Sequence, residues 1–275
     1  MPKRIAFFDV DRTLIPGSSL FLLARGAYAR DFFRVRDILR FGYGQVLFRL
    51  RGEHAGGIDR TRDSTLDFVI GRSQAELVEM GNEIVEERIL PRVYPDIFRV
   101  IEQHREEGDL TYLVTAAPIE LASSIAIALD MDGAVGTESE LDAGGYYTGR
   151  LVGAIMHGPE KAKAAAEVAE VAGIDLADCL AYSDSISDLP LLESVGYPHA
   201  VNPEHELRRL AMQRGWPIHE LRTRRRLLLV GIPAGLGGAG LFAGGVALGV
   251  GLERRNHRRR RNVIERIGRR WRSGR

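Results

Sequence analysis

Apolar and polar positions recur with two different periods along this chain, and the two periods predict different elements. Short apolar runs predict buried strands, and longer segments with apolar positions every three or four residues predict helices. Strands are expected at residues 4–10, 110–115, 179–183 and 197–201. Helices are expected at about 95–107 and 118–129, from Pro159 onward, and at about 187–194. A glycine-rich stretch at 133–150 is typical of a hairpin. Strands that alternate with helices predict a parallel sheet covered on both faces, which is an α/β, Rossmann-like fold.

Residues 14–90 carry the helical period and interrupt this alternation directly after the first strand. We therefore expect an inserted helical subdomain, called the cap below. The predicted domains are an α/β core of residues 1–13 and 91–221, the cap of residues 14–90, and a basic tail of residues 222–275 that includes a C-terminal apolar helix.

The composition fits a folded protein with a sizeable core. The chain has 275 residues, of which 45% are hydrophobic and 27% are charged, and this balance excludes an intrinsically disordered protein. The single cysteine, Cys179, excludes an internal disulfide and any site built from clustered thiolates.

The net charge of +1 conceals two parts of opposite sign. The tail holds fifteen arginines and two acidic residues, so the remainder of the chain is acidic. Residues 227–252 of the tail form an uncharged, glycine-rich segment that is long enough to cross a bilayer as a helix. Because basic clusters beside an apolar segment attract anionic lipids, we expect the tail to bind a membrane.

How segment 227–252 meets the membrane stays open. A single span would export eleven arginines, against the positive-inside tendency, whereas a helix lying on the surface would not. The alternative is a flexible linker to a nucleic-acid-binding tail, although no nucleic acid partner is expected. The first residues lack the apolar core of a secretory signal, so the α/β core is expected in the cytoplasm, at the cell membrane if the tail anchors it.

Aromatic residues and arginines are concentrated in residues 14–52 of the cap. One interpretation is a surface that contacts an anionic membrane or admits an apolar anionic substrate. The other, which we prefer, is an ordinary helical subdomain with an arginine-rich solvent face.

Acidic side chains follow two of the predicted strands. Asp9 and Asp11 end the first strand, and Asp184 and Asp188 follow the third. If the first strand continues, Asp9 and Asp11 share a face and converge on one ion or substrate; if the chain turns, Asp11 swings toward the substrate. Turn and capping roles explain each residue alone. Together, carboxylates at neighbouring strand ends are the oxygen ligands that Mg²⁺ prefers.

A hydroxyl and a lysine extend this pattern. Thr115 ends the second strand beside backbone N–H groups that open a helix, which suits a phosphate oxygen. Lys161 lies in the first turn of a helix, where the helix dipole disfavours a cation, so a role as phosphate counter-charge would explain its position. A helix cap and a solvated lysine are the simpler explanations of each, but the combination predicts a phosphate site.

These residues resemble, in order, the four motifs of the haloacid dehalogenase superfamily of phosphatases. The matching segments are residues 8–14 (FDVDRTL), residues 114–118 (VTAAP), Lys161, and residues 183–188 (SDSISD). The helical insertion resembles the cap of the phosphoserine-phosphatase-like branch. The resemblance covers about residues 4–205 and implies the fold of that superfamily.

The resemblance also implies a role for each matching residue. Asp9 would be the nucleophile that forms an aspartyl-phosphate. Asp11 would protonate the leaving alcohol and then activate water, which is general acid–base catalysis. Thr115 and the backbone N–H of Ala116 would bind phosphoryl oxygens, and Lys161 would neutralise charge beside the nucleophile.

The same resemblance implies a Mg²⁺ site. Asp9, Asp184 and the backbone carbonyl of Asp11 would hold the ion, and Asp188 would support its ligand shell. A carboxylate attacks a dianionic phosphate poorly because like charges repel, and a metal ion with a lysine offsets that repulsion.

One departure concerns the substrate. Phosphoserine phosphatases of this branch carry a glutamate shortly after the first motif that holds the substrate amine, whereas residues 15–19 (IPGSS) contain no acid. We therefore expect a Mg²⁺-dependent hydrolase of a small-metabolite or lipid-type phosphate monoester, with phosphoserine disfavoured. The alternative is a membrane-associated regulatory protein in which the phosphatase chemistry is incidental.

Overall fold

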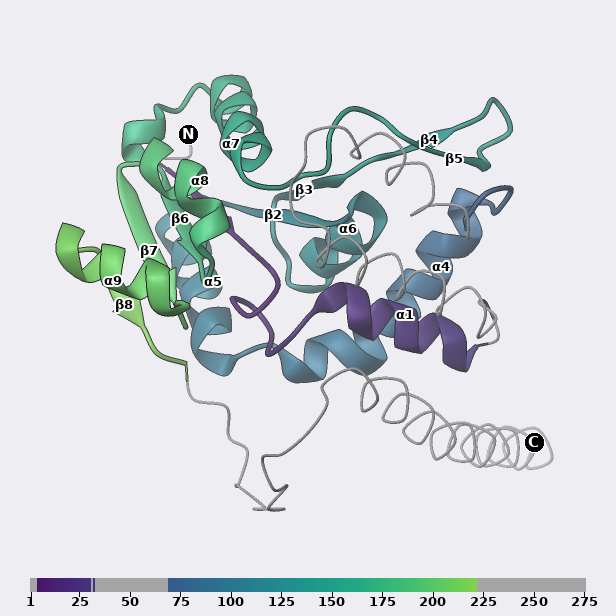
Figure 1. Cartoon of the computed structure of the whole chain (residues 1–275), viewed down its shortest axis with the longest axis horizontal. Helices are drawn as coiled ribbons and strands as arrows, with labels where there is room; N and C mark the ends of the chain where they lie inside the picture. Colours follow the sequence, from purple (N-terminus) through teal and green to yellow (C-terminus); the bar gives the residue numbers. More distant parts are fainter. Residues whose placement is uncertain (1–3, 31, 33–68, 222–275) are drawn as a thin grey trace, which may run out of the picture.

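The computed structural model describes residues 4–30, 32 and 69–221. Its centre is a six-stranded parallel sheet with the strand order β3-β2-β1-β6-β7-β8 (Figure 1). The strands are β1 (Ile5–Phe8), β2 (Leu110–Pro118), β3 (Gly133–Thr137), β6 (Leu180–Ser183), β7 (Tyr197–Val201) and β8 (Ile218–His219). The first strand of the chain is thus central, and its carboxyl end lies between those of β2 and β6.

Helices cover both faces of this sheet, because alternate side chains of each strand enter two separate apolar cores. Phe8 of β1 packs in the core under α5 (Pro95–Glu107) and α6 (Ile119–Ala128). Phe7 packs in the opposite core under α7 (Pro159–Ala172), α8 (Leu189–Ser194) and α9 (His205–Arg214). Each such fully buried aromatic or aliphatic side chain stabilises the fold by about 1.5–3 kcal/mol.

The described part of the cap consists of α1 (Ser19–Ala29) and α4 (Gln74–Ile84), followed by a π-helix (Val85–Ile89) and a 3₁₀ helix (Leu90–Arg92). Ser18 caps α1, with its Oγ accepting the Phe21 N–H. The two helices approach closely at Gly26, where a Cβ atom would lie 2.6 Å from Cγ1 of Ile84. Both helices share the core on the α5–α6 side of the sheet (Figure 1).

Smaller elements connect the layers. An antiparallel hairpin of β4 (Ser139–Leu141) and β5 (Tyr147–Leu151) extends away from the main sheet (Figure 1). Its turn follows from Asp142, whose Oδ1 accepts the N–H groups of Gly144 and Tyr146. Two further 3₁₀ helices, Leu176–Asp178 and Ile186–Asp188, flank β6.

The α/β, Rossmann-like fold is confirmed, and the expected helices and strands have the predicted type. Three local expectations were wrong. The hairpin is confined to residues 139–151, and residues 133–137 instead form the parallel strand β3. The last predicted element ends at Val201, whereas α9 and β8 follow it.

Strand β2 extends to Pro118 rather than ending at Thr115, with a shift in its register to β3 between Val114 and Pro118. Among the described residues, no helix has the length and apolar character that a membrane span requires. The expected apolar helix at 227–252 and the basic tail lie outside the described residues, as does most of the arginine-rich part of the cap. The division into core, cap and tail stays a prediction.

Candidate active site

Asp9 lies directly after β1, at the edge of the sheet where the carboxyl ends of β1, β2 and β6 meet. Its backbone N–H donates to the Tyr182 carbonyl oxygen at 3.0 Å, which continues the pairing of β1 with β6 beyond the end of the strand. The side chain is buried, with 6% of the residue exposed. A carboxylate is therefore held at the end of the central strand, where open α/β sheets bind their ligands.

Lys161 joins this carboxylate to a second one. Its Nζ lies 2.6 Å from Oδ1 of Asp9 and 2.7 Å from Oδ2 of Asp188. The Ser183 hydroxyl donates to the same Asp188 oxygen at 2.7 Å. All three ionised side chains are buried, and they come from positions as far apart as β1 and the helix α7. We call Asp9, Lys161 and Asp188 the buried triad.

Burial and charge act against each other in this triad. Burial raises the pKa of Asp9 to about 6, although the ammonium group of Lys161 opposes the shift and Asp188 adds to it. For Lys161, burial alone would lower the pKa, but Asp9 and Asp188 outweigh it and hold the pKa above its usual value. The lysine therefore keeps its positive charge at neutral pH, beside the carboxylate that would approach a phosphate.

Asp184 follows β6 and carries an unsatisfied oxygen. Its Oδ2 is buried and accepts no hydrogen bond, although Nε of Arg12 lies 3.1 Å away. Burial raises the pKa of Asp184 to about 7, with the negative charge of Asp9 adding to the shift and Arg12 opposing it. Buried carboxylate oxygens without donors are costly unless a cation meets them.

Asp11 lies on a tight turn after β1, where the N–H groups of Leu14 and Ile15 donate back to the Val10 carbonyl oxygen. Of the two arrangements considered above, the chain therefore turns. Oδ1 of Asp11 accepts the N–H of Ser19 at 2.7 Å, so the start of α1 holds this carboxylate in place. The hydroxyl groups of Thr13 and Ser19 are buried in the same region without a hydrogen-bond partner.

The Thr115 side chain is buried at the irregular end of β2, and its Oγ1 accepts the Ala117 N–H at 3.2 Å. Ala116 is exposed, and its carbonyl oxygen accepts from the Thr137 hydroxyl. Gly136 of β3 packs tightly beneath this segment, where a Cβ would lie 2.8 Å from the Ala117 carbonyl oxygen. The close packing of β3 against residues 115–118 therefore requires a residue without a side chain at position 136.

The donor set at these strand ends fits a hard divalent cation. Asp9 and Asp184 would supply carboxylate oxygens and Asp11 a backbone carbonyl oxygen, and the unsatisfied Oδ2 of Asp184 is the observation that fits a metal ligand most directly. Asp188 is already engaged by Lys161 and Ser183. Its contribution to the metal shell stays a prediction.

A second group of ligand atoms lies at the opposite, amino-terminal edge of the sheet. Among the described residues, His104, Glu107 and Asp109 have side-chain atoms close enough to share an ion. Arg4 already pairs with both carboxylates of this group, with its Nη2 lying 2.6 Å from Glu107 and 2.7 Å from Asp109. His104 is also hydrogen-bonded on both ring nitrogens, to Asp109 and the Tyr182 hydroxyl, at 2.9 Å each. This arrangement is a hydrogen-bonded ion network.

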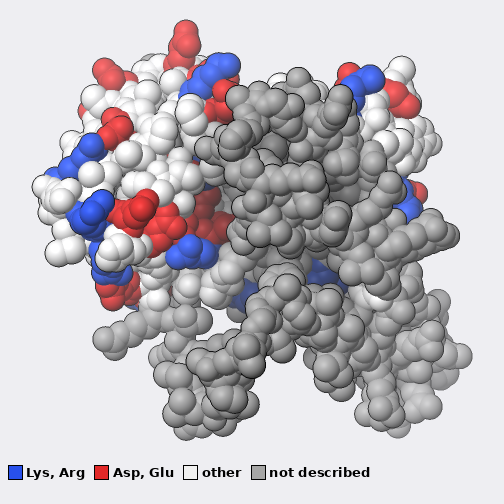
Figure 2. Space-filling model, viewed as in Figure 1, with Lys and Arg blue, Asp and Glu red and all other residues white. Residues whose placement is uncertain are grey.

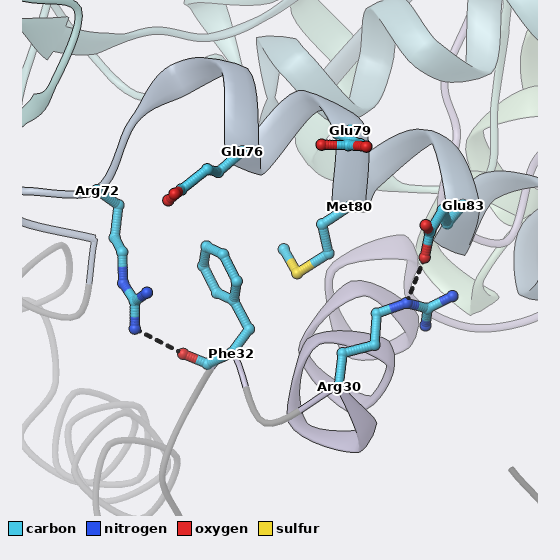
Figure 3. Close-up of a pocket in the computed structure, with 7 residues that line it drawn as sticks. All are labelled: Arg30, Phe32, Arg72, Glu76, Glu79, Met80 and Glu83. Carbon is cyan, nitrogen blue, oxygen red and sulfur yellow. Dashed lines mark hydrogen bonds and ion pairs between the residues drawn. The ribbon is translucent and has the colours of Figure 1, made fainter. Parts of the chain in front are cut away.

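An open pocket of about 320 Å³ lies on the cap, between the end of α1 and α4 (Figure 3). Arg30 pairs with Glu83 at its rim, and Arg72 stacks over the ring of Phe32 at 4.5 Å. The other lining residues are Glu76, Glu79 and Met80. None of the residues predicted from the motifs lines this pocket, so its position does not mark the chemistry.

The predicted site residues come from three strand ends and one helix, and the structure links Asp9, Lys161 and Asp188 by direct contacts. No role was predicted for Arg12, Ser183 or Ser19 from the sequence. Arg12 and Ser183 lie inside the quoted motifs, and that position was the signal available for them. Ser19 had no comparable signal, because its contact with Asp11 is made by a backbone N–H.

The model of the family described as haloacid dehalogenase-like hydrolase matches residues 6–193. The phosphoserine phosphatase SerB1 of Mycobacterium tuberculosis is 43% identical over 92% of this chain and 81% of its own length. The inhibition of morphological differentiation protein of Streptomyces azureus is 34% identical over 96% of both chains. A solved structure of a protein of unknown function from Bordetella pertussis covers 81% of this chain and all of its own, with 30% identity and a TM-score of 0.70.

These findings confirm the resemblance of the motifs, and the family model spans every motif from β1 to Asp188. The fold, the strand-end carboxylates and the buried lysine are consistent with it. The chain belongs to the haloacid dehalogenase-like hydrolase family.

Proposed function

We propose that the chain is a Mg²⁺-dependent phosphomonoester hydrolase that forms an aspartyl-phosphate on Asp9. The observation that supports this most is the contact of Lys161 with Asp9 at 2.6 Å inside a buried site. A cation held there lowers the repulsion between the Asp9 carboxylate and an approaching phosphate dianion.

The chemistry assigned to the side chains takes two displacements. A carboxylate oxygen of Asp9 attacks phosphorus while the bond to the leaving oxygen breaks, and the carboxyl proton of Asp11 moves to that oxygen. The Asp11 carboxylate then takes a proton from water as the water oxygen attacks phosphorus, which frees Asp9 and inorganic phosphate. The hydrogen bond from Ser19 orients Asp11 for both proton transfers.

The remaining residues bind and orient. Thr115 and the N–H of Ala116 are assigned to the phosphoryl oxygens, which requires the Thr115 hydroxyl to turn toward the ligand. Asp188 orients Lys161 toward Asp9. When bound, Mg²⁺ would be held by Asp9, Asp184 and the carbonyl of Asp11, and would supply positive charge to the phosphoryl group.

The substrate we propose is a small-metabolite or lipid-type phosphate monoester. The name of the mycobacterial relative brings phosphoserine into consideration. Residues 15–19 of this chain contain no carboxylate that could pair with a substrate amine, which argues against an ammonium-bearing ester. Phosphoserine therefore belongs in any substrate panel as the discriminating compound.

A substrate panel with a nucleophile variant tests the proposal. The wild-type chain with Mg²⁺ should hydrolyse at least one phosphate monoester, and Asp9→Asn should lower kcat/KM by about 10³-fold or more. Asp130→Asn removes an exposed carboxylate that pairs with Arg105 and should leave the rate unchanged. Equal rates for wild type and Asp9→Asn would contradict the proposal.

The regulatory alternative leads to a different expectation. The name of the Streptomyces relative describes an effect on development and states no chemistry, so it is compatible with either function. A regulatory protein with incidental chemistry would keep its biological effect in the Asp9→Asn variant. A phosphatase would lose that effect together with its turnover. Attachment of the tail to anionic lipids would place either protein at the inner face of the cell membrane, and it remains part of the proposal.

A further inference from the structure

The side chain of Arg12 lies against the carboxylate that the proposed metal site needs. Its Nε is 3.1 Å from Oδ2 of Asp184, and its own side chain is 53% exposed, whereas that of Asp184 is 5% exposed. The guanidinium group of a half-exposed side chain therefore contacts a buried carboxylate oxygen.

The backbone holds Arg12 in this position. Its φ angle is 62°, in the left-handed region that non-glycine residues seldom adopt. The Arg12 N–H donates to the Gly17 carbonyl oxygen at 3.2 Å, and the Asn202 side-chain amide donates to the Arg12 carbonyl oxygen at 3.3 Å. The turn that brings Asp11 back toward α1 thus fixes the direction from which the Arg12 side chain leaves the chain.

The contact is an ion pair without an aligned hydrogen bond. Oδ2 of Asp184 accepts none, although the guanidinium nitrogen is close. Its lone pairs remain available to a harder cation, and such an ion would meet the positive charge of Arg12 at short range. Two cations beside one carboxylate oxygen repel each other, so metal binding and the contact with Arg12 oppose each other.

We propose that Arg12 is an internal competitor for the divalent-cation site, displaced from Asp184 when the metal binds. The inference rests on the proposed function, because it takes Asp184 as a metal ligand. Arg12 then offsets part of the carboxylate charge in the metal-free protein and makes the site bind its metal more weakly than the carboxylates alone would. Arg12 is a positioning residue in this scheme, since it acts on a ligand and not on the substrate.

Calorimetric titration of the full chain with Mg²⁺ or Mn²⁺ alone tests this. Arg12→Ala should bind the metal about tenfold more tightly, because a unit charge within a few ångströms of the ion is removed. Arg12→Lys keeps the charge and should stay within about threefold of wild type. Arg105→Ala removes an exposed, ion-paired arginine near the opposite edge of the sheet and should leave the affinity unchanged.

Equal or weaker metal binding by Arg12→Ala would overturn the inference, and so would an Arg12→Lys variant that binds as tightly as Arg12→Ala. If Arg12→Ala does not fold, Arg12→Gly, which suits the left-handed backbone, carries the same expectation. Asp184→Asn separates the two proposals. If it leaves metal binding intact in the wild-type background, the proposed metal site itself is wrong. If it abolishes binding while Arg12→Ala matches wild type, only the role of Arg12 fails.

Discussion

Lys161 brings a positive charge into a region that the fold otherwise closes to water, and its two carboxylate partners make that charge tolerable. Asp9 and Asp188 lie 2.6 and 2.7 Å from its Nζ, and the three side chains are almost fully buried. Removing one partner of a buried ion pair leaves the others uncompensated, which costs far more than losing an exposed pair. The stability of the fold and the chemistry of the site therefore depend on the same residue.

Lys161→Met should lower the free energy of unfolding by about 3–5 kcal/mol, because Asp9 and Asp188 would then face each other without a cation. Urea unfolding at neutral pH in the absence of metal measures the change. Lys163→Met, on an exposed position of the same helix, is the matched control and should change stability by less than about 0.5 kcal/mol. A small loss of stability for Lys161→Met would mean that Lys161 does not contact Asp9 and Asp188 in solution.

At this scale the sequence predicted residue types well and their contacts poorly. Asp9, Asp184 and Lys161 follow strands or begin a helix, and such positions are recognisable from the residues nearby. The contact of Arg12 with Asp184 joins residues 172 positions apart, and no local pattern reports it. The link from Lys161 to Asp188 was likewise beyond prediction, because it depends on how α7 packs against the 3₁₀ helix Ile186–Asp188.

Ring stacking across the sheet links β1, β6, β7 and β8 on one face. Phe8 stacks on Tyr182 at 4.6 Å between ring centroids, and His199 lies 4.6 Å on the other side of Tyr182. His219 stacks on His199, with Nδ1 of His199 lying 2.8 Å from Nε2 of His219. Burial, with a contribution from His219, lowers the pKa of His199 to about 4. The row of rings is therefore stable with both imidazoles neutral.

A fall in pH should lower the stability of the packing of these four strands. The pKa of His199 rises from about 4 in the folded protein to an ordinary value near 6.5 on unfolding. The unfolded chain thus binds the proton more tightly between these values. The neutral imidazole contributes its full stability above about pH 6.5, and this contribution is lost as the pH falls toward 4. Because the ring is partly exposed, the loss is about 1–2 kcal/mol after solvent screening.

His199→Phe keeps an aromatic ring in the row and removes its titration. Urea unfolding at pH 7.5 and pH 5.0 should show that wild type loses about 1–2 kcal/mol more than this variant across the interval. His205→Gln, at the exposed start of α9, should follow wild type. Identical pH dependence for wild type and His199→Phe would show that the histidine pair does not sense the pH.

The regular elements were predictable where their apolar pattern is long, as in α5 and α7. The sequence did not predict α9, β8 or β3, and each omission has a physical reason. Only Leu207 and Ala211 of α9 are buried, so its apolar period is faint, and β8 has two residues. The β3 segment (GAVGT) contains two glycines, and Gly136 is needed for close approach to Ala117 rather than for a turn. A glycine that permits packing looks the same in sequence as one that permits a turn.

For the molecule as a whole, charge is divided between an acidic body and a basic tail. On the face of the core shown in Figure 2, acidic and basic side chains lie next to one another. Arg208 lies 2.6 Å from Glu220, and Arg214 lies 2.5 Å from Glu193. Screened surface pairs of this kind stabilise a fold little. The basic tail lies outside the described residues, and an external anionic surface is its predicted partner.

Truncation after Leu221 tests that prediction. Full-length protein should float with vesicles that contain anionic lipid, less so as salt is raised, whereas the truncated chain should remain in the aqueous fraction. Vesicles of neutral lipid are the control for a purely apolar insertion. If both chains behave alike with anionic vesicles, the tail does not direct the protein to membranes.

In the proposed reaction, Asp9 becomes phosphorylated during turnover. Asp11→Asn should slow the second displacement, because no carboxylate remains to take a proton from water, so the phosphoenzyme accumulates. The measurement is peptide mass spectrometry of this variant after acid quenching with Mg²⁺ and a chromogenic phosphate ester. We expect one added phosphoryl group on the peptide that carries Asp9, and none when Asp9→Asn is also present. Turnover without that adduct, or an adduct on another residue, would contradict it.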